Sequence, residues 1–125
     1  MKYLVDSSVW IDYLEGNSKG EKFTNFLEDS ELYALLLNIA EVVSKVKRKK
    51  GNFEIAYSSI VSNAQIFEVT PRMAKEAGLL HAQIKGEIPN FSLADAIVIV
   101  AAKTISAKIL TTDEHFKRFK EAVLL

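Results

Sequence analysis

Residues 3–14 have the sequence YLVDSSVWIDYL, in which a short apolar run leads through an acid and two serines into a helical pattern. A run such as Tyr3–Val5 is typical of a strand buried on both faces of a parallel sheet. The other predicted strands are Leu32–Leu37, Ile66–Val69, Ile109–Thr111 and Ala122–Leu125. Because helical patterns separate these runs, we predict an α/β fold: a three-layer α/β/α sandwich with a central parallel sheet of four to five strands.

The helical patterns fill the intervals between the strands. Thr70 followed by Pro71 indicates an N-cap and a proline at the first helical position. In Leu93–Ala102 every residue except Asp95 is apolar, so we expect this helix in the interior. The other expected helices are Val9–Leu14, Lys22–Leu27, Ile39–Lys49, Phe53–Ala64 and a helix from Pro71 to about Lys85.

Length and composition limit the class of protein. With 125 residues, 49% of them apolar and 26% charged, we expect one globular domain over residues 1–125. The absence of cysteine excludes a thiolate nucleophile and a cysteine-based zinc site, and fits the cytoplasmic location that we expect. Asp6 comes too early for a signal peptide, and no apolar run approaches the ~20 residues of a membrane span.

The formal net charge is zero, but the charge is unevenly distributed. Residues 1–31 carry three basic and seven acidic side chains, residues 32–52 carry five and one, and the remainder carry eight and eight. The basic residues of the middle segment lie together at the end of a predicted helix, where they complement its dipole and would also contact RNA phosphates. This basic cluster is Lys45, Lys47, Arg48, Lys49 and Lys50.

Four acids lie at strand ends or helix starts. Asp6 and Asp113 follow predicted strands directly, Glu41 follows a strand by four residues, and Asp95 opens the apolar helix. Ligand sites of parallel sheets lie beyond the carboxyl ends of the strands, so these acids would converge. Each also has a structural explanation, because Ser92 with Asp95 and Asn38 with Glu41 resemble capping boxes.

Carboxylates that lie close together repel one another, and a hard cation bound between them would offset this repulsion. Mg²⁺ and Mn²⁺ prefer oxygen ligands. In phosphodiester cleavage such ions lower the pKa of water and stabilise the leaving oxygen. The sequence therefore indicates Asp6, Glu41, Asp95 and Asp113 as candidate metal ligands.

Four short motifs, in this order, resemble the PIN domain family, and in particular its VapC-type toxin ribonucleases. They are residues 4–14 (LVDSSVWIDYL), 38–42 (NIAEV), 92–97 (SLADAI) and 110–116 (LTTDEHF). The resemblance covers almost the whole chain. Ser7 and Ser8 stand where the family often has Thr or Asn.

The resemblance implies a metal-dependent endoribonuclease in which the four acids hold Mg²⁺ or Mn²⁺. It also implies that Ser7 or Thr112 orients a ligand or water, that the partner is a small antitoxin, and that the protein forms a homodimer. Asp12 is expected to be a surface charge, His81 to be structural, and His115 to border the site without being needed for it.

Other functions stay open. A non-toxin RNA-processing nuclease and a non-catalytic domain that binds RNA or protein fit the same sequence. A receiver domain is disfavoured because residues 49–54 (KKGNFE) offer no acceptor aspartate, and a haloacid-dehalogenase-type phosphatase because Ser8 stands where a second aspartate is required.

Overall fold

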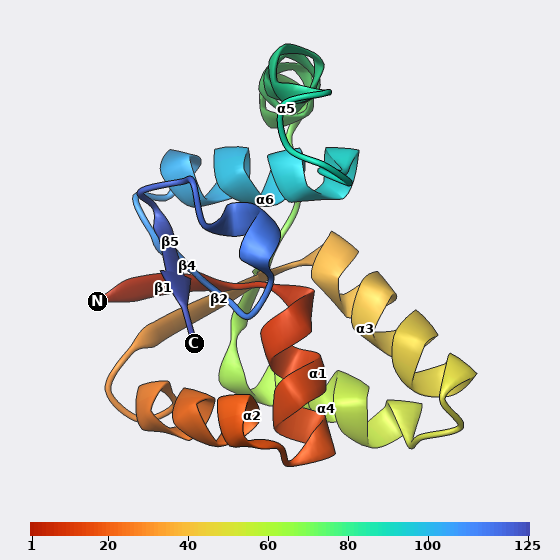
Figure 1. The fold of residues 1–125 in the computed structure, drawn as a ribbon. Helices are drawn as coiled ribbons and strands as arrows, with labels where there is room; N and C mark the ends of the chain where they lie inside the picture. The colour runs from red at the N-terminus through yellow and green to blue at the C-terminus, as the bar shows by residue number, and fades with distance from the viewer.

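The computed structural model describes all residues, 1–125, and contains one five-stranded parallel sheet (Figure 1). Its strands are β1 (Lys2–Val5), β2 (Glu31–Leu35), β3 (Gln65–Phe67), β4 (Lys108–Thr111) and β5 (Ala122–Leu124). The strand order is β3-β2-β1-β4-β5, so that β1 lies in the centre between β2 and β4. The predicted α/β class and the parallel sheet are confirmed.

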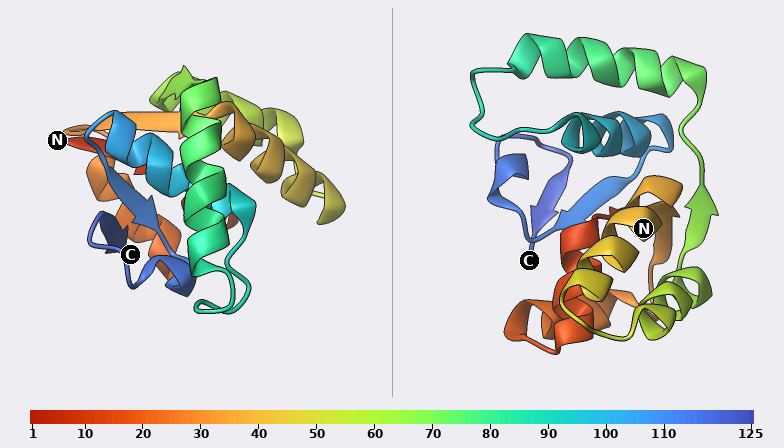
Figure 2. Two further views of the ribbon diagram at one scale, coloured as in Figure 1. Left: turned by 90° about the horizontal axis from the view of Figure 1, so that it is seen from above. Right: turned by 90° about the vertical axis from the view of Figure 1, so that its right-hand side faces the viewer.

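Helices cover both faces of this sheet (Figures 1 and 2). They are α1 (Ser7–Glu15), α2 (Ser18–Phe23), α3 (Leu36–Arg48), α4 (Phe53–Asn63), α5 (Pro71–Ile84) and α6 (Leu93–Thr104), with single 3₁₀ turns η1 (Thr24–Phe26) and η2 (Glu114–Phe116). α6 lies on one face with α5 outside it, whereas α1, α2 and α4 lie on the other (Figure 1). None of these helices has the length and apolar character that crossing a bilayer requires.

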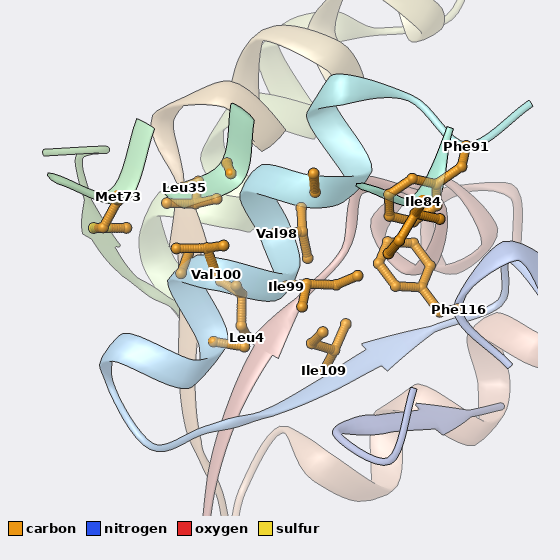
Figure 3. Close-up of a cluster of buried hydrophobic side chains, with 14 of the residues drawn as sticks. Leu4, Leu35, Met73, Ile84, Phe91, Val98, Ile99, Val100, Ile109 and Phe116 are labelled. Atoms are coloured by element: carbon orange, nitrogen blue, oxygen red, sulfur yellow. The ribbon is translucent and has the colours of Figure 1, made fainter. Parts of the chain in front are cut away.

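Alternation along the strands divides the core into two clusters. Leu4 and Ile109 point toward α6, where they pack with Ile99, Met73 of α5 and other apolar side chains (Figure 3). The neighbouring residues of the same strands, Val5 and Leu110, point to the opposite face. There they pack with Trp10, Phe23, Val42 and Ile60.

The apolar helix α6 is buried as predicted. Ala96 and the five residues from Val98 to Ala102 are buried between the sheet and α5. The middle of α6 is apolar on every side because the sheet covers one side and α5 the other. At the start of α5 the Met73 N–H donates to the Thr70 hydroxyl at 3.2 Å, which confirms the predicted N-cap.

Three helices begin earlier than the sequence predicts, and the first is α1, which begins at Ser7 and not at Val9. α3 begins at Leu36, and not at Ile39, because the Asn38 side chain accepts a hydrogen bond from the Leu35 N–H at 3.0 Å and ends the strand there. α2 begins at Ser18, and not at Lys22, because Asn17 caps it by accepting from the Gly20 N–H at 3.0 Å. Both caps use Asn side chains, which compete well for backbone hydrogen bonds.

Candidate active site

Asp6 lies at the carboxyl end of the central strand and is only 5% exposed. It occupies the N-cap position of α1, but its side chain caps no backbone N–H. Instead Oδ2 accepts hydrogen bonds from the hydroxyls of Ser8 at 2.9 Å and Thr111 at 3.0 Å. The capping explanation for this acid therefore fails, and its carboxylate remains available to a ligand.

Burial dominates the electrostatics of Asp6. Desolvation raises its pKa from the ordinary value of 3.8 to about 6, against the opposing effect of hydrogen bonds from Ser8 and Thr111. The negative charges of Glu41 and Asp95 raise the pKa further, which shows that these acids lie within electrostatic range. A buried carboxylate beside two others is stabilised by a cation that neutralises them.

Glu41 lies in the second turn of α3, because that helix begins at Leu36. The capping-box alternative for Asn38 and Glu41 is wrong, since Asn38 caps Leu35 and Glu41 is not at a capping position. Desolvation raises the pKa of Glu41, interactions with Ser7 and Asn38 lower it, and Asp95 raises it. The absence of a capping role leaves Glu41 free to face Asp6 and Asp95.

Asp95 caps its helix and also lies among the four acids. Its Oδ2 accepts from the Ser92 N–H at 2.9 Å and its own N–H donates to the Ser92 hydroxyl at 3.0 Å, which is the predicted capping box. This cap holds the carboxylate at the start of α6, beside Asp6 and Glu41. Capping therefore fixes the position of the acid and does not remove it from the site.

Asp113 follows β4 and caps the short turn η2. Its Oδ1 accepts from the His115 N–H at 2.9 Å and lies 3.1 Å from Nδ1 of the same residue. The Asp113 N–H donates to the Thr111 hydroxyl at 3.0 Å. Thr111 thus connects Asp113 to Asp6 through one side chain.

A cavity of about 520 Å³ joins the four acids. It is lined by residues of α1 and α3, which begin at the same edge of the sheet (Figure 1). Its other lining residues come from α1, α3 and α6. The complete lining is Asp6, Ser7, Ser8, Ile11, Ala40, Glu41, Ser44, Lys45, Arg48, Ala94, Asp95, Val98 and Asp113. The structure therefore places all four candidate ligands, and Ser7, around one space.

The hydroxyl residues differ in part from those expected. Ser7 lines the cavity beside Glu41. Thr112 does not line it, because its hydroxyl donates to Asp12 at 2.7 Å. Ser8 and Thr111, which sequence reasoning missed, contact Asp6 instead. Strand register could have identified Thr111, since Val5 pairs with Leu110 and the next positions are Asp6 and Thr111.

The five basic residues at the end of α3 separate into two groups. Lys45 and Arg48 line the cavity, on the same helical face as Glu41. The other three point elsewhere. Nζ of Lys47 lies 5.5 Å from the centre of the Phe53 ring, Lys49 pairs with Glu15 at 3.0 Å, and Lys50 ends the helix with a φ of 62°.

Comparison with known proteins gives this arrangement a family. A model described as PIN domain matches residues 3–122. The chain belongs to the PIN domain family. No curated protein matches the sequence.

Solved structures share the fold of this PIN domain. A toxin–antitoxin complex from Klebsiella pneumoniae superposes with a TM-score of 0.74 at 19% identity, covering 97% of this chain and 95% of that one. VapBC2 from Rickettsia felis, bound to a promoter DNA fragment, superposes with a TM-score of 0.74 at 16% identity, covering 100% of this chain and 98% of that one. Mycobacterium tuberculosis VapC20, described as a Sarcin-Ricin loop cleaving toxin, superposes with a TM-score of 0.69 at 13% identity, covering 88% of this chain and 87% of that one.

The donor set of the PIN domain fits a hard divalent cation. Four carboxylates border one cavity, and two of them have raised pKa values that a bound cation would reverse. No cysteine is present to favour a softer ion. Asp6, Glu41, Asp95 and Asp113 are therefore suited to hold Mg²⁺ or Mn²⁺.

Proposed function

We propose that this protein is a metal-dependent endoribonuclease that cleaves RNA phosphodiester bonds, and that it is the toxin of a toxin–antitoxin pair. The observation that carries the proposal is the gathering of Asp6, Glu41, Asp95 and Asp113 around one cavity at the carboxyl edge of a PIN domain sheet. A binding module would not need four carboxylates of which one is buried at an energetic cost.

The four acids would hold Mg²⁺ or Mn²⁺. When bound, the metal supplies positive charge that activates water as the nucleophile and stabilises the charge of the transition state. The chain itself positions the ligands: Ser8 and Thr111 hold Asp6, the Ser92 cap holds Asp95, and Ser7 contacts Glu41. Because these contacts fix the carboxylates, the site can bind a metal ion without rearranging its side chains.

The substrate is proposed to be RNA because a basic wall faces the acids. Lys45 and Arg48 extend from Glu41 along one face of α3 and give the cavity a positive side. An RNA phosphate held there would place a neighbouring phosphodiester beside the acids. The description of the similarly folded VapC20 as a Sarcin-Ricin loop cleaving toxin supports this substrate class.

The proposed partners are a cognate antitoxin and a second copy of the chain, in the cytoplasm. Similarly folded proteins come from a toxin–antitoxin complex of Klebsiella pneumoniae and from VapBC2 of Rickettsia felis, which supports the antitoxin. Exposed large apolar side chains, Leu36, Leu79 and Leu93, are consistent with a homodimer that would cover some of them. The mass of the purified protein in solution tests the homodimer.

Cleavage of RNA by matched variants tests the function. Asp6→Asn and Asp95→Asn should abolish Mg²⁺- or Mn²⁺-dependent cleavage, while circular dichroism shows an intact fold. Asn is chosen at Asp95 because its amide oxygen can still accept from the Ser92 N–H. Asp29→Asn, at an exposed turn, is the control and should cleave normally. The proposal fails if the wild type cleaves no RNA with either metal, or if all three variants cleave equally.

A further inference from the structure

His115 lies against two of the four acids, although it does not itself line the cavity. Its Nδ1 is 3.1 Å from Oδ1 of Asp113 and 3.9 Å from Oδ2 of Asp95. Ligand atoms of these three residues all lie within 4.8 Å of one another. Atoms that bind one ion at about 2.1 Å are about 3 Å apart when adjacent and about 4 Å apart when opposite. Both distances from Nδ1 of His115, 3.1 and 3.9 Å, therefore fit a shared coordination sphere, and the 4.8 Å limit for the whole set exceeds it by less than about 1 Å.

The fold holds the imidazole in this position. Phe116, the next residue, is completely buried in the core cluster under α6 (Figure 3). Two hydrogen bonds fix the η2 turn. The His115 N–H donates to Oδ1 of Asp113, and the Phe116 N–H donates to the Asp113 carbonyl at 3.2 Å. His115 therefore needs no large movement to reach an ion between Asp95 and Asp113.

The three side chains also remain accessible from solvent. The imidazole is 34% exposed, the Asp113 side chain 32% and the Asp95 side chain 16%. Asp95 and Asp113 line the cavity, whereas His115 contacts them from its rim. An ion held by Asp95 and Asp113 would have carboxylate oxygens on its inner side and an imidazole nitrogen on its outer side.

The chemistry of this nitrogen differs from that of the other donors. Mg²⁺ is bound mainly through oxygen, whereas imidazole suits transition-metal dications, whose affinities for nitrogen sites rise from Mn²⁺ toward Cu²⁺. Asp6 and Glu41, which also line the cavity, offer oxygen alone. A metal position that includes the imidazole therefore favours different ions from one that uses only carboxylates.

We propose that His115 is a further metal ligand, which with Asp95 and Asp113 forms a mixed nitrogen and oxygen position that favours Mn²⁺ and later transition metals over Mg²⁺. This inference rests on the proposed metal-dependent function, and it adds a selectivity to that site. A hydrogen-bonding role for His115, in which its N–H only orients the two carboxylates, is the alternative that the experiment must separate.

Direct metal binding separates the two roles. Calorimetric titration of the full chain with Mn²⁺ and with Mg²⁺ gives the ratio of the two affinities. His115→Ala should lower the Mn²⁺ affinity by about tenfold or more, with a smaller effect on Mg²⁺, so that the ratio falls. His115→Asn keeps an N–H donor near the carboxylates but lacks the imidazole, and it should lose selectivity as His115→Ala does. Equal losses for both metals, or full retention by His115→Asn, would overturn the proposal.

A spectroscopic measurement gives an independent test. Electron spin echo spectroscopy of the Mn²⁺-loaded protein should show coupling to an imidazole nitrogen. The chain contains only two histidines, and His81 lies elsewhere, with its ring 6.4 Å from that of Phe91. The coupling should vanish in His115→Ala and persist in His81→Ala. Mn²⁺ binding without nitrogen coupling overturns the role of His115 and leaves the nuclease function standing, whereas coupling in a protein that cleaves no RNA overturns the nuclease function alone.

Discussion

The hydroxyl of Thr111 donates to Oδ2 of Asp6 at 3.0 Å, across the ends of the neighbouring strands β4 and β1. The same hydroxyl oxygen accepts from the Asp113 N–H at 3.0 Å. One completely buried side chain therefore sets the position of two acids that come from different parts of the chain. It also favours the ionised form of Asp6, because hydrogen bonds to a carboxylate lower its pKa.

Thr111→Val should make metal binding more sensitive to acid. The variant keeps the shape of the side chain but removes its hydrogen bond, so that the pKa of Asp6 rises above its present value of about 6. Carboxylates bind metal when they are deprotonated. The pH at which Mn²⁺ affinity falls to half should therefore increase, as calorimetry between about pH 5 and pH 8 would measure.

Thr112→Val is the matched control for this experiment. Its hydroxyl donates to Asp12 at 2.7 Å, and Thr112 does not line the cavity. The variant should lose some stability through the broken link between η2 and α1, with the pH dependence of Mn²⁺ binding unchanged. An equal displacement of both pH profiles would contradict the assigned role of Thr111.

Asp6→Asn should stabilise the metal-free protein near neutral pH. Between about pH 4 and pH 6 the folded protein holds a proton on Asp6 that the unfolded chain has lost, so the free energy of unfolding falls as pH rises. Above pH 6 this cost is complete. Removing the buried charge should raise the free energy of unfolding by about 1–3 kcal/mol at pH 7.5, and by close to zero at pH 4. Urea denaturation of the wild type and the variant, in the presence of a chelator, measures the free energy of unfolding at both pH values.

Divalent metal should reverse this order of stability. A ligand that binds only the folded state adds about 2.7 kcal/mol at 100 times its dissociation constant. Wild type should gain that stability with Mn²⁺, whereas Asp6→Asn should gain much less. A wild type that is insensitive to Mn²⁺ would argue against the metal site itself.

The two cavity-lining cations should contribute more to RNA binding than their neighbours do. Arg48 and Lys45 face the acids, whereas Lys47 lies over the Phe53 ring and Lys50 ends the helix. Arg48→Gln should weaken binding of a short RNA and reduce the salt dependence of its affinity by about one phosphate contact. Lys50→Gln removes the same charge from a position outside the cavity and should change affinity less. Equal effects of the two variants would indicate nonspecific attraction by the whole segment.

The acids could be found from the sequence because each follows a recognisable boundary. Asp6 and Asp113 come directly after apolar strand runs, and Asp95 is the single charge at the start of an apolar helix. Parallel strands place such positions at one edge of the sheet. This reasoning needs only the order of the elements, so an error of three residues in the start of α3 did not affect the selection of Glu41.

The contacts between side chains could not be predicted in the same way. Thr111 and Thr112 are adjacent, and the register of β1 with β4 decides which of the two hydroxyls meets Asp6. Ser7 and Ser8 are adjacent as well, and the direction in which α1 leaves Asp6 decides between them. The phase of α3 likewise decides which of the five cations between Lys45 and Lys50 face the cavity. The spacing of residues in the sequence determines neither the strand register nor the helix phase. A shift of one residue in the register turns a strand side chain to the other face of the sheet.

Gly20→Ala should destabilise the fold next to the site. α2 crosses α1 so closely that a Cβ at Gly20 would overlap the backbone carbonyl of Asp12, which cannot move without displacing α1. Asp12 in turn holds Thr112 beside the η2 turn. We expect a loss of about 1–3 kcal/mol in the free energy of unfolding, as for overpacking of a rigid contact. Gly78→Ala lies in α5, where a Cβ meets no atom within 4 Å, and should instead gain about 0.5–1 kcal/mol from helix propensity. Urea denaturation of both variants measures the difference, and a stabilising Gly20→Ala would show that α1 and α2 separate more easily than this packing implies.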